Sequence, residues 1–208
     1  SGVVYTDAQT DVLRRDFTIN GLLYDPLEEK LIDYVSGQAD IRDKIVRAIG
    51  DPRQRFAEDR LRVLRAVRFG ARLGYTIENS TWEAVKSMAS EIHQVSKERI
   101  REELVRILTE GQASRGVRML HETGLLQEIA PEVSWSHQLE RALGMIRRDA
   151  THDFATAVLL MQCSNEVAGA VMDRLKYSRV ETKHVVELLG NSPRFQAVRQ
   201  MTVSARSE

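Results

Sequence analysis

Hydrophobic positions divide the chain into a short N-terminal part with strand-like character and a longer part with helical periodicity. In the first part, residues 17–24 are short and rich in strand-forming residues, residues 25–30 are turn-prone, and residues 31–35 form a second apolar run. This order predicts a β-hairpin. Because an isolated hairpin is only marginally stable, we expect it to belong to a larger sheet that lies before residue 1.

After the break at Ser36-Gly37, apolar residues recur at helical spacing. Residues 40–49 show one helical turn pattern, which Gly50-Asp51-Pro52 ends. Residues 56–73 predict a strong helix that Gly74 closes at a C-cap position. Further helices are predicted at residues 78–88, 97–109, 112–122, 137–147, 154–162, 166–175 and 179–189. The predicted fold class is therefore mainly α, with a small β-hairpin remnant followed by an all-helical body.

Composition narrows the class of protein. Of 208 residues 42% are hydrophobic, which is enough for a sizeable core. Thirty basic residues balance thirty acidic ones, so a globally basic nucleic-acid binder is excluded while a local basic face is allowed. No stretch reaches about 18 apolar residues and no secretory signal is present, which predicts a cytoplasmic protein with no membrane partner. The single cysteine, Cys163, excludes an internal disulfide and is interpreted as a buried thiol.

Arginines concentrate between residues 51 and 75, a segment that contains seven arginines and only three acidic residues. In the predicted helix, Arg62, Arg65 and Arg68 recur every third residue, and Arg72 follows within the same arc of roughly 120°. Two interpretations stay open. The row is either a solvated face with ion pairs, or a site for a polyphosphate, since no acid after Asp59 offsets the repulsion and guanidinium groups match phosphate oxygens. Arg14-Arg15-Asp16 offers a second anion-binding candidate.

Four motifs lie in order between residues 11 and 130. They occupy residues 14–22, residues 32–41, residues 50–69 around Glu58-Asp59-Arg60-Leu61-Arg62, and residues 97–104. They resemble, in this order, the sheet-ending motif, the connecting motif, the Glu-Asp-x-x-Arg nucleotide-recognition motif and the bracing motif of the tRNA nucleotidyltransferase and bacterial poly(A) polymerase family. Ser36 stands where a second glycine is usual, and Arg60 where a proline is common. Beyond residue 130 the resemblance is loose.

The resemblance implies three regions. Residues 1–50 would be the C-terminal remnant of a nucleotidyltransferase head domain, residues 51–130 a helical neck that recognises the base and binds RNA, and residues 131–208 a truncated helical body or tail. The family's Gly-Gly loop and Asp-x-Asp pair, which hold Mg²⁺, belong well before Arg14, and Asp7 with Asp11 is not that pair. We therefore expect a fragment without catalytic residues or metal ligands, inactive by itself, from a parent enzyme that uses Mg²⁺.

The implied activity is template-independent addition of C, A or both to tRNA 3′ ends, as CCA addition or repair, with ATP and CTP as substrates and the base chosen by side chains. A carboxylate only accepts hydrogen bonds, so it suits the exocyclic amine of C or A and repels the carbonyl of G or U. By carry-over, Asp59 and Arg62 read the base, while Arg15, Arg65 and Arg68 hold the triphosphate or neighbouring polar groups. The remaining family positions are Asp16 and Asn20 for ribose contacts or loop geometry, and Glu58, Glu98 and Arg99 for structural bracing.

Three alternatives remain beside CCA addition. Poly(A) tailing of other RNA 3′ ends uses the same motifs. The chain alone could act as a non-catalytic module that binds tRNA and nucleotides. A His-Asp metal phosphohydrolase is disfavoured, because His137 and His152-Asp153 are its only hints and residues 159–164 supply no ligands. The isolated histidines His93, His121 and His184 are interpreted as surface or structural residues. The sequence predicts no oligomeric state.

Overall fold

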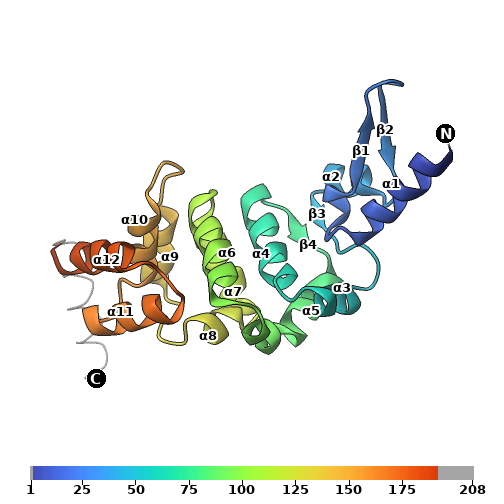
Figure 1. The fold of residues 1–208 in the computed structure, drawn as a ribbon. Helices are drawn as coiled ribbons and strands as arrows, with labels where there is room; N and C mark the ends of the chain where they lie inside the picture. The colour runs from blue at the N-terminus through green and yellow to red at the C-terminus, as the bar shows by residue number, and fades with distance from the viewer. Residues whose placement is uncertain (1, 192–208) are drawn as a thin grey trace.

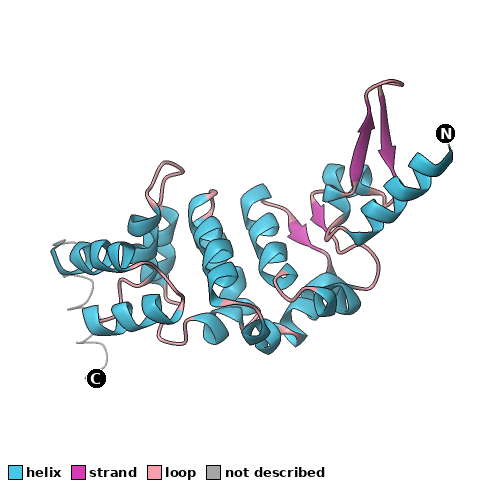
Figure 2. Cartoon of the chain, in the orientation of Figure 1, coloured by secondary structure: helices cyan, strands magenta, loops and turns pink. Residues whose placement is uncertain are grey.

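The computed structural model describes residues 2–191, and its longer strands lie in the N-terminal part (Figure 2). The elements of this part are α1 (Gly2–Arg14), η1 (Thr18–Asn20), β1 (Leu22–Asp25), β2 (Lys30–Asp33), α2 (Gly37–Arg42) and β3 (Ile45–Val46). Strands β1 and β2 pair antiparallel, with Leu22 opposite Asp33, and the hairpin projects from the helical part (Figure 1). The predicted hairpin is confirmed, although its first strand is shorter than expected because residues 18–20 form the 3₁₀ turn η1.

The rest of the described chain is a curved row of helices that runs from the hairpin to the C-terminal end (Figure 1). Its elements are α3 (Pro52–Glu58), α4 (Arg62–Leu73), β4 (Thr76–Ile77), α5 (Asn79–Ser87), η2 (Ala89–Gln94), α6 (Lys97–Thr109), α7 (Ala113–Glu122), α8 (Leu125–Ile129), α9 (His137–Gly144), α10 (His152–Leu159), α11 (Asn165–Arg174) and α12 (Arg179–Asn191). The mainly α fold is confirmed, and α6 has the predicted bounds. Among residues 2–191, no helix is long and apolar enough to cross a bilayer.

The long helix predicted over residues 56–73 is wrong in one respect, because it is two helices. Asp59 adopts an extended backbone (φ −147°, ψ 103°), and its Oδ1 accepts a hydrogen bond from the Leu61 backbone N–H at 3.1 Å. This local bond replaces helical hydrogen bonding and separates α3 from α4. Glu58 therefore ends α3 instead of lying in the first turn of one long helix. Gly74 closes α4 with φ 68°, as predicted.

A second difference concerns residues 40–49, where the helical pattern fails after Arg42. Ile45 and Val46 form the strand β3, which pairs in parallel with Thr76 and Ile77 of β4. A strand of two residues is too short to show an alternating pattern, so the sequence carried no signal for it. The pairing ties the end of the N-terminal part to the segment that follows α4.

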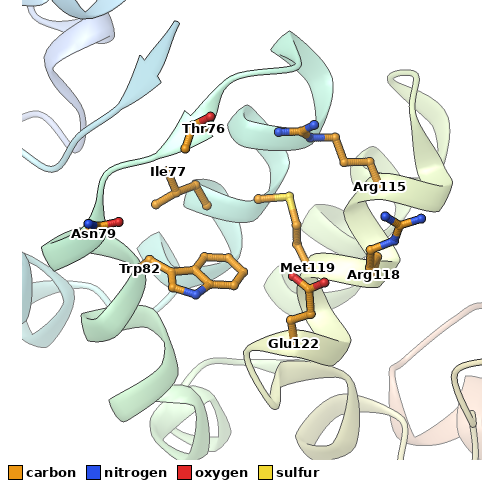
Figure 3. A pocket seen from close by; sticks show the side chains of 8 residues that line it. All are labelled: Thr76, Ile77, Asn79, Trp82, Arg115, Arg118, Met119 and Glu122. Atoms are coloured by element: carbon orange, nitrogen blue, oxygen red, sulfur yellow. The ribbon is translucent and has the colours of Figure 1, made fainter.

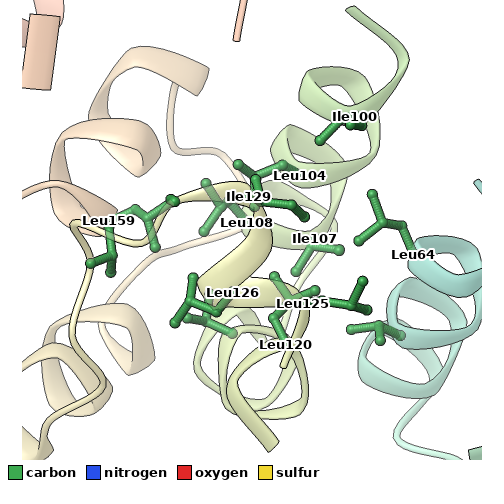
Figure 4. Packing of buried hydrophobic residues seen from close by; sticks show 14 of the residues in the cluster. Leu64, Ile100, Leu104, Ile107, Leu108, Leu120, Leu125, Leu126, Ile129 and Leu159 are labelled. Carbon is green, nitrogen blue, oxygen red and sulfur yellow. The ribbon is translucent and has the colours of Figure 1, made fainter. Parts of the chain in front are cut away.

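The core is one continuous apolar cluster that runs through the row of helices. In Figure 4, Leu64 of α4, Ile107 of α6 and Leu120 of α7 lie within this cluster, and Leu126 of α8 extends it. Helix α4 packs against both α6 and α7, so its remaining face is held at the boundary with the N-terminal part. Cys163 is buried, as predicted.

Candidate functional site

A cavity of about 520 Å³ opens where the end of α1, the junction between α3 and α4 and the first turn of α6 meet. Its lining residues are Arg15, Asp16, Asn20, Asp59, Arg62, Arg65, Phe69 and Arg99. Four of the five predicted nucleotide-binding residues are thereby brought together, along with both predicted ribose or loop residues. Four guanidinium groups against two carboxylates leave the lining positive, which favours an anionic ligand such as a phosphate.

Asp59 lies at the junction of α3 and α4 and uses both carboxylate oxygens. While Oδ1 accepts from the Leu61 N–H, Oδ2 accepts from Nη2 of Arg99 at 2.9 Å. Arg99 reaches it from the first turn of α6, a helix that Ser96 caps. Burial raises the pKa of Asp59, but the hydrogen bonds from Arg99 and Leu61 and the charges of Arg99 and Arg62 outweigh burial, so the pKa lies below its ordinary value. Asp59 is therefore an ionised acceptor at neutral pH.

Arg62, the first residue of α4, is held firmly beside Asp59. Its Nη1 donates to the carbonyl of Arg55 and to Oε2 of Glu58, both at 3.0 Å, and its Nη2 donates to the carbonyl of Arg14 at 3.0 Å. Hydrogen bonding from Arg62, together with Arg55, lowers the pKa of Glu58. Glu58 thus fixes the orientation of Arg62, which is consistent with the predicted bracing role.

Arg65 is oriented by a small network on the loop after α1. Its Nε donates to Oδ2 of Asp16 at 2.7 Å, while Oδ1 of Asp16 accepts from the Phe17 N–H and from the Asn20 side chain, each at 2.9 Å. Asp16 is only 6% exposed. These bonds tie Asp16 and Asn20 into the loop after α1, and both roles predicted for them, ribose contact and loop geometry, stay predictions.

Arg15 lies on the same loop as this network. Its Nη1 donates to the carbonyl of Asn20 at 2.8 Å, and its Nη2 donates to Asp11 at 3.0 Å. The pair with Asp11 lies at the surface, and the side chain of Arg15 lines the cavity. Arg15 therefore carries a positive charge into the cavity on a side chain that Asn20 and Asp11 orient.

Arg68 does not line the cavity, unlike the other predicted nucleotide-binding residues. Its side chain is 5% exposed, and its Nε donates to Oε2 of Glu103 on α6 at 2.7 Å. Glu110 accepts from both Arg68 and Arg72 at 3.3 Å. The pair with Glu103 places Arg68 in the packing of α4 against α6, and direct contact between Arg68 and a nucleotide would break this buried pair.

Glu98 is exposed in the first turn of α6, where the helix dipole favours an anion.

Sequence reasoning missed Phe69 and Glu103. Phe69 follows Arg65 by one helical turn, lines the cavity, and has the guanidinium carbon of Arg65 at 5.7 Å from its ring centroid. Phe17 packs edge-on against it, with 5.7 Å between the centroids. The i, i+4 spacing from Arg65 was the available signal for Phe69. Glu103 belongs to the motif at residues 97–104, but its partner lies 35 residues away.

Magnesium is the metal that the family resemblance implies, and the described residues do not fit it. Within residues 2–191, no group of three or more histidines, cysteines, aspartates or glutamates comes together in a way that could hold a metal ion. The carboxylates of Asp16 and Asp59 are engaged by Arg65 and Arg99. The lining of the cavity therefore suits an anionic ligand and does not suit a metal ion.

Two family models match the chain on either side of this cavity. Residues 2–47 match one described as "Poly A polymerase head domain", and residues 74–136 match one described as "Probable RNA and SrmB- binding site of polymerase A". The chain is 35% identical over 167 residues to a CCA-adding enzyme of Levilactobacillus brevis, an alignment that covers 80% of the chain and 42% of that protein. It is 36% identical over 131 residues to poly(A) polymerase I of Escherichia coli, covering 63% of the chain and 28% of that protein.

Solved structures share the fold. One described as "tRNA-processing enzyme (apo form I)" aligns with a TM-score of 0.74 at 21% identity, over 89% of this chain and 54% of its own. A Thermotoga maritima CCA-adding enzyme complexed with tRNA aligns with a TM-score of 0.69 at 22% identity, over 94% of this chain and 51% of its own. The chain spans less than half the length of the curated relatives that it matches. Motifs, family models and fold agree, and the chain belongs to the family of CCA-adding enzymes and bacterial poly(A) polymerases.

Proposed function

We propose that the cavity binds a ribonucleoside triphosphate and that the native protein adds C, A or both to the 3′ end of tRNA. The observation that carries this proposal is the position of Asp59 and Arg62 in a positively lined cavity that Arg15 and Arg65 also line. The lining of the cavity combines residues of the region that matches the head model, residues 59–69, and Arg99 of the region that matches the RNA-binding model. A nucleotide held there would be presented to an RNA bound along the helices.

Base choice follows from the ionised carboxylate of Asp59. It accepts from the exocyclic amine that C and A share, and it repels the carbonyl that G and U present at the corresponding place. The contacts of Arg62 engage three of the five N–H donors of its guanidinium group, two on Nη1 and one on Nη2, so donors remain for the adjacent ring nitrogen. The pair can thus distinguish bases without a template strand.

Phosphate binding falls to Arg15 and Arg65, whose contacts carry no base identity. Arg65 is oriented by Asp16, and Arg15 by the carbonyl of Asn20. Phe69 closes the side of the cavity next to Arg65. The second candidate activity is addition of A alone, which the similarity to poly(A) polymerase I of Escherichia coli favours.

An extension assay tests the proposed function. The native protein is incubated with a tRNA that ends before its CCA sequence, with Mg²⁺ and with the four triphosphates singly and together. We expect incorporation from CTP and ATP and little from GTP or UTP. A product longer by three nucleotides identifies CCA addition, and a run of A identifies poly(A) tailing. Absence of incorporation from every triphosphate would contradict the proposal.

A further inference from the structure

A second cavity, of about 390 Å³, lies between β4, the start of α5 and the outer face of α7 (Figure 3). Its lining residues are Thr76, Ile77, Asn79, Trp82, Arg115, Arg118, Met119 and Glu122. None of them lines the first cavity. All of them fall within residues 74–136, the region that matches the RNA-binding family model.

The lining of this second cavity separates into an apolar floor and a polar rim. Figure 3 shows Trp82, Ile77 and the Met119 side chain around the hollow, with the guanidinium groups of Arg115 and Arg118 on its α7 side. Trp82 packs against the core while staying partly exposed, so its ring is already fixed. A flat apolar ligand can stack on such a ring at little cost in conformational entropy.

Arg115 carries a donor whose bonding the described residues do not complete. Its Nη2 donates to the carbonyl of Tyr75 at 2.9 Å, which ties the side chain to the loop after α4. Its Nε is buried and has no hydrogen-bond partner among residues 2–191. Because this nitrogen is enclosed by protein atoms, a ligand in the cavity would meet the outer edge of the Arg115 guanidinium group and not Nε.

The rim also carries groups that suit the edge of a base. Arg118 pairs with Glu140 of α9 and adds a second positive charge. Glu122, also on α7, has a carboxylate that can accept from an exocyclic amine, and across the cavity the side-chain amide of Asn79 can accept from an amine or donate to a ring acceptor (Figure 3). Glu122 would repel an acidic peptide, whereas a nucleotide presents both an amine and a phosphate.

We propose that this cavity is a second nucleotide subsite, which takes one unpaired nucleotide of an RNA. The base stacks on Trp82 above the floor of Ile77 and Met119, and the phosphate lies against Arg115 and Arg118. The assignment of RNA rests on the proposed function. A free nucleotide has the same chemistry, so the experiment separates the two sources.

Fluorescence of Trp82 gives a direct readout. The chain has two tryptophans, so Trp135→Phe leaves Trp82 as the single reporter. The protein is titrated with a tetraribonucleotide and, separately, with AMP and CMP. We expect saturable quenching of the Trp82 fluorescence, and we expect the tetranucleotide to bind with higher affinity than either mononucleotide. Equal affinities would assign the site to free nucleotides, and absence of quenching by all three probes would overturn the subsite.

Variants in the same single-tryptophan background locate the contact. Arg118→Gln should lower the affinity for the tetranucleotide by about tenfold, which is the effect of losing one charge-assisted contact to phosphate. Arg179→Gln removes an exposed arginine from α12, far from the cavity in Figure 1, and should leave the affinity unchanged. Equal effects of the two variants would mean that the probe senses only overall charge, which overturns the proposal.

A second measurement does not depend on the Trp135→Phe background. Binding of a fluorescein-labelled tetranucleotide is followed by anisotropy, with Trp82→Phe keeping an aromatic face and Trp82→Leu keeping only apolar volume. We expect Trp82→Phe to retain the affinity for the tetranucleotide and Trp82→Leu to lose about tenfold of it, because stacking requires an aromatic ring. Equal binding by both would refute stacking. Asp59→Asn should leave this affinity intact, so failure of the first cavity and failure of this subsite give different results.

Discussion

Arg99 donates to the carboxylate of Asp59 at the cavity, and this contact governs how Asp59 titrates. Burial alone would raise the pKa of Asp59, and Arg99 supplies both a hydrogen bond and a charge that lower it. We predict that Arg99→Gln raises this pKa. Because the folded value in the unaltered chain lies below the ordinary one, stability from the ionised carboxylate is present above the ordinary pKa and is lost as pH falls through the folded value.

In Arg99→Gln, that loss should be smaller and should end at a higher pH, because the folded pKa moves up toward the ordinary value. Carboxyl carbon shifts of the aspartates, followed by NMR titration, measure the change directly. Arg72→Gln is the matched control, since Arg72 pairs with Glu110 and has no contact with Asp59. An unchanged pKa of Asp59 in Arg99→Gln would show that Leu61 and Arg62, and not Arg99, keep this pKa low.

The buried pair of Arg68 and Glu103 gives a separate prediction on stability. Arg68→Met leaves the Glu103 carboxylate, 5% exposed, without its closest partner. Breaking a buried ion pair on one side costs about 3–5 kcal/mol, whereas replacing both partners by apolar residues is nearly neutral. We therefore expect Arg68→Met to lower the free energy of unfolding strongly and Arg68→Met with Glu103→Leu to recover most of it.

Chemical denaturation of the two single variants and the double variant completes the cycle. A nucleotide-binding role for Arg68 without a packing role would give the opposite pattern, in which Arg68→Met folds with full stability and loses affinity for all triphosphates. Additive losses in the double variant would likewise contradict the assignment.

Residues that share a contiguous motif were predictable, and those defined by distant packing were not. Arg15, Asp59, Arg62 and Arg65 were identified because each motif carries its chemistry within a few positions, and the fold brings those motifs to one cavity. The expectation of an unbalanced arginine row ignored partners from other elements. Those partners are Asp16 for Arg65, Glu103 for Arg68 and Glu110 for Arg72. They lie 49, 35 and 38 residues away along the chain, so no local spacing reveals them.

Close contact between η1 and the start of α2 sets a limit on side-chain size. A Cβ added at Gly37 would lie 2.2 Å from the carbonyl oxygen of Thr18, a backbone atom that cannot move without shifting η1. We predict that Gly37→Ala lowers the free energy of unfolding by about 1–3 kcal/mol, the usual cost of overpacking. Gly144→Ala, at the end of α9, adds a Cβ with nothing within 4 Å and should be neutral or slightly stabilising.

Thermal unfolding of Gly37→Ala and Gly144→Ala compares the two glycines. Equal midpoints for the variants would show that α2 does not pack on η1 as closely as described. Because η1 ends at Asn20, the Gly37 variant should also disturb the loop that orients Arg65.

At the level of elements, helical periodicity predicted most of the chain and failed where single contacts decide. The bounds of α6 followed from its helical spacing, and the structure adds the Ser96 cap at its start. The separation of α3 from α4 contains neither glycine nor proline and depends on the bond from Leu61 to Asp59. Strand β3 exists only because β4, thirty residues later, is placed beside it.

Across the whole molecule, the two proposed sites draw on different parts of the chain, although Arg99 of the first cavity belongs to the region that matches the RNA-binding model. The first lies at the junction near the head model, and the second lies within the RNA-binding model. The alignment covers 42% of the Levilactobacillus brevis relative, and the described residues do not fit a metal site. Nucleotide binding is therefore the property that tests these residues most directly.

Calorimetric titration of the chain with CTP, ATP, UTP and GTP examines the base reading by Asp59. We expect C and A to be preferred by roughly 10- to 150-fold, the worth of a charge-assisted hydrogen bond. Asp59→Asn keeps an oxygen that can accept from the Leu61 N–H, so α4 should still form while the preference is lost. Arg15→Gln should lower the affinity for all four triphosphates by the same factor, because contacts to phosphate carry no base identity. Full preference for C and A in Asp59→Asn would contradict the account.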